Sequence, residues 1–170
     1  MFNDPAWASQ EEWDAYAWFG FAISEAQTVE RQLLLIAVAI KNAEAAQRES
    51  ENLWFELYDR FGRLTLGQLR KELKTSEVLA DDLLEMLNRA VDARNALAHE
   101  FFVPRSANAG EQSPTMAKEE LQKTASLFSN LSTRLELVLW PLVEKLHVQR
   151  DALERETDRL LSVDDAQPHE

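Results

Sequence analysis

Apolar side chains recur along the first part of the chain in alternating steps of three and four. The series is Phe19, Ala22, Ala26, Val29, Leu33, Ile36 and Ile40. Because an α-helix completes a turn about every 3.6 residues, this spacing lays one apolar stripe along a helix. Ser9, followed by Glu11 and Glu12, suits the start of such a helix. The pattern predicts one long helix over residues 9–48.

Shorter apolar segments follow this helix. One of them runs from Glu51 and stops naturally at Gly62, with its apolar side formed by Leu53, Trp54, Leu57, Tyr58 and Phe61. Thr65 is a candidate N-cap for a second short helix. Ser76, with Glu77 behind it, predicts the start of a third helix, and its stripe consists of Leu83, Leu87, Ala90, Arg94, Leu97 and Phe101.

The last third of the chain begins with a loop and continues as a second long helix. Residues 103–115 contain Pro104, Gly110 and Pro114 among small polar residues, which predicts a loop. A helix is expected over 116–161, where Leu121, Phe128, Leu135 and Leu142 lie seven apart. Pro141 is expected to kink or interrupt it.

These elements predict an all-α fold, an antiparallel helical bundle with two long helices and two or three shorter ones. A chain of 170 residues suits one domain, expected over 1–161, followed by a disordered acidic tail over 162–170. Leu34, Leu35 and Val38 widen the stripe of the first helix beyond the needs of a small bundle. We therefore expect a homodimer.

Composition narrows the function classes. The chain has no cysteine, which excludes disulfides, thiol catalysis and cysteine-bound zinc. The longest apolar run, residues 33–40, is too short to cross a bilayer, and the acidic N-terminal region does not resemble a targeting peptide. We expect a cytoplasmic protein without a membrane partner. The net charge of -12 argues against broad, non-specific binding of nucleic acid.

One basic run stands against this acidic background. It contains Arg60, Arg63, Arg70, Lys71 and Lys74, and Glu72 is the one acidic residue between Arg60 and Lys74. Two interpretations stay open. The run is either a solvated helix face or a local track for the phosphates of RNA.

Candidate chemistry concentrates in the segment Arg94-Asn95-Ala96-Leu97-Ala98-His99. Asn95 and His99 are four residues apart and share a helix face, whereas Arg94 and His99 point about 140° apart on a continuous helix. Either the arginine pairs with Asp92, Glu85 or a carboxylate of another helix while the histidine packs, or the segment forms an active site.

Metal chemistry is not expected. Glu144 and His147 form one Glu-x-x-His pair, but a di-iron bundle needs two such pairs, and His99 has Ala96 where its glutamate would stand. Hydrolase signatures and phosphate-binding glycine loops are also missing. We predict neither a metal nor a cofactor.

Arg94-Asn95, three further residues, His99 and then Phe101-Phe102 resemble the Arg-polar-x-x-x-His signature of HEPN domains of the prokaryotic type. The segments that precede the motif are similar to those of some prokaryotic members. They are residues 65–69 and the helix expected from Ser76. The resemblance covers about residues 50–102. It implies an all-α domain that forms a homodimer.

The resemblance also implies a function. Many HEPN domains are metal-independent endoribonucleases that act as toxins or phage-defence effectors, with a composite site built by both subunits. His99 is then the general acid or base at a ribose 2′-OH, Arg94 stabilises charge on the phosphate, and Asn95 orients them. RNA is the expected substrate, and a cognate antitoxin or regulatory protein is an expected partner. The alternative is a non-catalytic HEPN-like module for dimerisation or partner binding.

Overall fold

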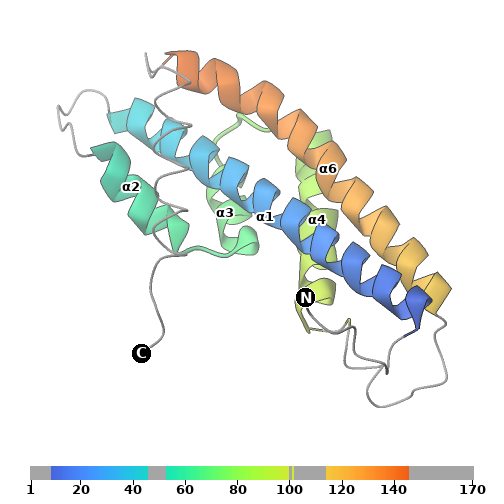
Figure 1. Ribbon diagram of the computed structural model, residues 1–170. Helices are drawn as coiled ribbons and strands as arrows, with labels where there is room; N and C mark the ends of the chain where they lie inside the picture. The colour runs from blue at the N-terminus through green and yellow to red at the C-terminus, as the bar shows by residue number, and fades with distance from the viewer. Residues whose placement is uncertain (1–8, 46–52, 100, 102–113, 146–170) are drawn as a thin grey trace, which may run out of the picture.

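The computed structural model describes residues 9–45, 53–99, 101 and 114–145. These residues form helices and no strand: α1 Gln10–Ala45, α2 Leu53–Gly62, α3 Leu66–Lys74, α4 Asp81–His99 and α6 Pro114–Lys145 (Figure 1). The prediction of an all-α helical bundle is therefore confirmed, with α1 and α6 as the two long helices and three shorter ones between them. None of the described helices is long and apolar enough to cross a membrane.

The two long helices lie side by side and run in the same direction (Figure 1). An ion pair of 2.7 Å joins Asp14 to Lys118, each in the first turns of its helix. α4 runs against both, because Asp82 near its start is paired with Arg134 of α6. The antiparallel arrangement thus holds for α4 with the long helices and not for the long helices with each other. The three short helices return the chain to the end where α1 began.

The core lies along the C-terminal half of α1. Every residue from Gln32 to Ile40 is buried, and α6 lies along one side of this half while α2 and α3 lie on another (Figure 1). Leu34, Leu35 and Val38 are 8%, 7% and 0% exposed. The apolar surface that suggested a dimer from the width of the α1 stripe is therefore covered within one chain.

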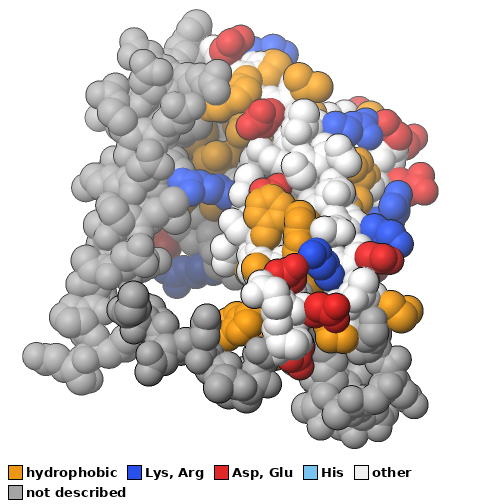
Figure 2. Space-filling model, turned by 45° about the vertical axis from the view of Figure 1, so that its right-hand side comes forward, with side chains coloured by type: hydrophobic (Ala, Val, Ile, Leu, Met, Phe, Trp, Pro, Cys, Tyr) orange, Lys and Arg blue, Asp and Glu red, His pale blue; other side chains and the backbone are white. Residues whose placement is uncertain are grey.

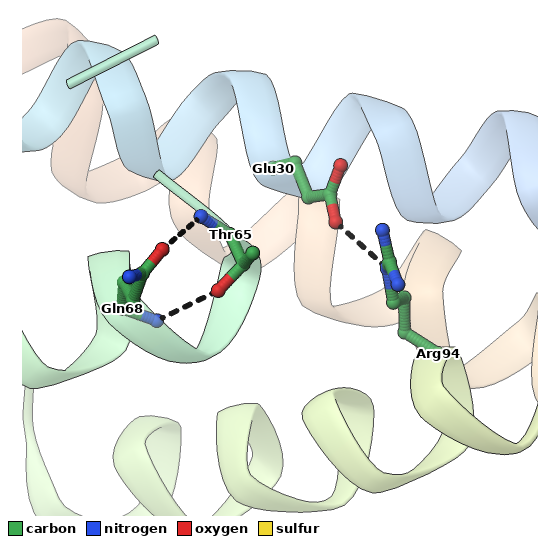
Figure 3. A network of polar contacts seen from close by, with 4 residues as sticks. All are labelled: Glu30, Thr65, Gln68 and Arg94. Carbon is green, nitrogen blue, oxygen red and sulfur yellow. Dashed lines mark hydrogen bonds and ion pairs between the residues drawn. The ribbon is translucent and has the colours of Figure 1, made fainter. Parts of the chain in front are cut away.

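Local signals place most helix boundaries correctly. α1 begins at Gln10 after Ser9, whose amide donates to Glu12 Oε2 at 2.6 Å. Thr65 caps α3 through reciprocal bonds with Gln68, as predicted (Figure 3): its amide donates to Oε1 at 2.8 Å, and its Oγ1 accepts from the Gln68 amide. α2 ends at Gly62.

The predicted helix start at Ser76 is wrong, and α4 begins at Asp81. Both the amide and the hydroxyl of Ser76 donate to the carbonyl of Leu73, at 3.1 and 2.6 Å. Ser76 therefore closes α3 instead of opening α4. Glu77 then adopts a left-handed φ of 55°, which no helix continues through.

The last helix begins at Pro114, so the end of the predicted loop belongs to α6. Proline suits this position because the first amides of a helix need no intrahelical acceptor. α6 passes Pro141 without interruption and continues to Lys145. Residues 103–113, the helix expected over 146–161 and the acidic tail over 162–170 lie outside the described residues.

The Asp82–Arg134 pair makes stability depend on pH. The Arg134 hydrogen bond lowers the pKa of Asp82 below its ordinary value of 3.8. The pair therefore stabilises the fold fully above that value, and its contribution disappears as the pH falls through the lower folded pKa. In thermal unfolding followed by circular dichroism, we expect Asp82→Asn to melt below the parent at about pH 7, with the gap closing in acid. Asp81→Asn is the control, and a gap that is constant with pH would contradict the prediction.

Candidate active site

The Arg94–His99 segment forms the last turns of α4, with its members on two faces. Asn95 and His99 are exposed, whereas the side chain of Arg94 is only 33% exposed. Arg94 lies on the same side of α4 as the buried residues Leu87, Ala90 and Leu97, as its spacing predicted. Because α4 is continuous to His99, the separation of about 140° between Arg94 and His99 applies within one chain.

Arg94 is held by a carboxylate of α1. Its Nε donates to Glu30 Oε1 at 3.1 Å, and the Glu30 side chain is 29% exposed (Figure 3). Of the partners considered from sequence, a carboxylate of another helix is the one found. Neither Nη1 nor Nη2 forms a hydrogen bond with the rest of the described chain. The bond therefore fixes the inner edge of the guanidinium and leaves its outer nitrogens for an anionic oxygen.

Glu30 itself was not predicted as a site residue. It lies four residues after Ala26 and three before Leu33, at the edge of the apolar stripe of α1. Arg94 holds the corresponding position on the stripe of α4. Two opposite charges on stripes that face a common core are the signal that sequence reasoning could have used.

His99 is the last residue of α4, and Phe101 just beyond it contacts α1. The amide of Phe101 donates to the carbonyl of Ala96 at 3.0 Å, a bond that closes the helix end. The Phe101 ring packs on Phe19 of α1 with centroids 4.9 Å apart. These contacts hold the end of α4 against α1, so His99 is exposed on an anchored helix end.

A polar stripe leads along α4 to His99. Asn88, Asp92, Asn95 and His99 are all exposed and are spaced four, three and four residues apart. Arg70 of α3 donates to Asn88 Oδ1 at 2.7 Å. Arg70 therefore stands at one end of the stripe, about 17 Å along the helix axis from His99. Asp92 lies between them and opposes an anion there.

The other basic residues of the predicted phosphate track are not joined to this stripe. Arg60 lies over the Phe61 ring, 5.5 Å from its centroid, and Arg63, just after α2, pairs with Asp59 of α2 at 2.8 Å. Lys71 and Lys74 are exposed on α3. On the face shown in Figure 2, Lys and Arg side chains are scattered among Asp and Glu side chains and form no continuous patch. Their role in RNA binding stays a prediction.

Two hollows in the described part of the chain lie elsewhere. An open one between α4 and α6 is lined by residues that include Met86, Arg89 and Lys123. A smaller one between α1, α2 and α3 includes Lys41 and Glu72. Neither contains Arg94 or His99. Within the same described ranges, no group of three histidine, aspartate or glutamate residues is placed to hold a metal ion. His147 lies outside them.

No protein-family model, no curated protein and no solved structure matches the chain.

Proposed function

We propose that this chain is a HEPN-like, metal-independent endoribonuclease of the toxin or phage-defence type, which acts on RNA through a composite site in a homodimer. The observation that carries the proposal is the geometry of Arg94. Glu30 fixes its Nε at 3.1 Å, and its outer nitrogens have no partner in the described chain. The exposed Asn95 and His99 follow on the same helix.

The chemistry needs a base, an acid and a cation near one phosphate. His99 takes the proton of a ribose 2′-OH, and the freed oxygen attacks the neighbouring phosphorus. The bond from phosphorus to the 5′-oxygen breaks, and the leaving oxygen takes up a proton from water, which serves as the acid. Arg94 stabilises the negative charge that develops on the phosphate, while the Asn95 amide orients the reacting groups. The products carry a 2′,3′-cyclic phosphate and a 5′-hydroxyl.

The arginine and the histidine of each active site come from different subunits in this proposal. Arg94 and His99 diverge by about 140° on α4, and neither lines either of the two hollows described above. A two-fold axis near the end of α4 places Arg94 of one chain close to His99 of the other. The activity of an enzyme that cuts cellular RNA must also be inhibited when it is not needed. A cognate antitoxin or regulatory protein therefore belongs to the same proposal.

A second candidate function is a non-catalytic HEPN-like module for dimerisation or partner binding. The same Arg94–Glu30 contact favours it, because the pair ties α4 to α1 and partly neutralises the arginine. Asp92 beside the motif and the net charge of -12 point in the same direction. The two candidates differ in whether RNA is cut.

The test is cleavage of a panel of single-stranded RNAs by purified protein in excess chelator. We expect cleavage with the product ends given above, and a rate that Arg94→Ala lowers by about 10²–10³-fold. Lys123→Ala is the matched control, because Lys123 is exposed on α6 and belongs neither to the motif nor to the predicted phosphate track. A parent that forms dimers but cuts no RNA would refute the nuclease and retain the second candidate.

A further inference from the structure

One side of the N-terminal half of α1 is open to solvent. Its central column recurs in steps of four and three, and consists of Trp13, Ala17, Gly20, Ser24, Gln27 and Arg31. The four inner residues are exposed, and the two end residues are half-buried. α2 and α3 lie only beside the other half of α1 (Figure 1). The column is therefore a helix face that no described helix covers.

Aromatic rings flank the column. Phe21 is 49% exposed and Tyr16 is 37% exposed. Tyr16 makes an edge contact with Trp13 at 6.0 Å between centroids, and Phe21 makes one with Trp18 at 5.5 Å. Aromatic residues and arginine are enriched where proteins bind one another, whereas a solvated helix face is mostly charged.

Gly20 in the middle of this face has no explanation within one chain. Glycine is disfavoured inside a helix, yet a Cβ added at Gly20 would meet nothing within 4 Å. Its φ is not in the left-handed region, so the backbone does not require glycine either. A missing side chain at an open position allows the backbone of another molecule to approach closely.

We propose that this face binds a second copy of the chain, with the two α1 helices antiparallel and crossing near Gly20 and Ser24. The column is self-complementary about its centre: Gly20 then faces Ser24 of the partner, and Ala17 faces Gln27. The ends match as well, since Arg31 meets Trp13 and the carboxylate of Glu12 in the first turn of the partner helix. Arg31 has no ion pair within the described residues. In a two-fold interface each such contact occurs twice.

This interface rests on the proposed function, because it supplies the second subunit that a composite site needs. It also lies beside the motif. Phe19 of α1, which packs on Phe101 just after His99, belongs to the same segment of α1 as the column. The column spans about 27 Å of helix, and we expect a small interface with a dissociation constant on the order of micromolar.

The test measures mass in solution without RNA, by sedimentation and light scattering over a range of protein concentrations. We expect the parent to form a dimer, and Gly20→Leu to raise the dissociation constant at least about 10-fold while the melting temperature of the monomer is unchanged or higher. Arg31→Glu should weaken the dimer to a smaller extent. Gly62→Leu is the matched control, since Gly62 is also exposed with nothing within 4 Å, on a different helix.

A parent that is monomeric at every concentration, or a dimer that Gly20→Leu leaves intact, would overturn the interface. If the chain dimerises through another face, Gly20→Leu leaves the dimer intact. If this face binds a different protein, the parent is monomeric. A dimer that Gly20→Leu disrupts but that cuts no RNA would leave the interface standing and refute only the nuclease.

Discussion

Replacing His99 with alanine is expected to lower the rate of RNA cleavage by about 10²–10⁴-fold, the range for loss of a general acid or base. His99 is exposed and makes no hydrogen bond within the described residues, so the fold does not depend on it. Circular dichroism and the dimer mass should therefore match those of the parent. The measurement is the initial cleavage rate of one RNA in excess chelator.

Two further variants separate catalysis from binding. Asn95→Ala removes an amide that orients groups and carries no charge, so a smaller loss than for His99→Ala is expected. Lys123→Ala removes a positive charge from another helix, outside the motif and the predicted phosphate track, and should leave the rate unchanged. A cleavage rate that survives His99→Ala would mean that the chemistry lies at another site or in a contaminant.

Replacing Phe128 with alanine is expected to lower the free energy of unfolding by about 3–5 kcal/mol. Phe128 is among the largest fully buried side chains, with no exposed surface, on the face of α6 that covers α1. Its removal loses apolar burial and leaves a cavity that a densely packed core does not close. The measurement is equilibrium unfolding in urea, monitored by helical circular dichroism.

Leu137→Ala on the same helix is the control, because Leu137 is 75% exposed. Its effect should stay within about 0.5 kcal/mol, as for other surface positions. Equal losses of stability in both variants would contradict the burial of Phe128 where α6 packs against α1.

The periodic pattern was sufficient to predict the helices. A stripe such as the one in α1 repeats over about six turns, so single residues that break it do not change the outcome. Boundaries depend on a few local groups, and there the prediction was mixed. The Thr65 cap was found, but Ser76 donates backwards to Leu73 and ends α3, where its sequence context resembles a start.

Tertiary features were harder to predict, because they depend on which stripe meets which. Leu34, Leu35 and Val38 suggested an intermolecular surface, yet they are buried within the single chain. The spacing of Arg94 placed it on the core stripe correctly, but its partner Glu30 lies 64 residues away on a helix whose direction the pattern does not give. The same holds for the contact between Arg70 and Asn88.

The composite site is tested most directly by mixing two inactive variants. Arg94→Ala and His99→Ala are purified separately, mixed in equal amounts and allowed to exchange subunits before the cleavage rate is measured in chelator. Half of the dimers then contain one chain of each kind, and each of these holds one intact Arg94–His99 pair across the two-fold axis. We expect the mixture to recover about a quarter of the parent rate. A mixture that exchanges subunits but is no more active than the separate variants would contradict a site shared between two chains.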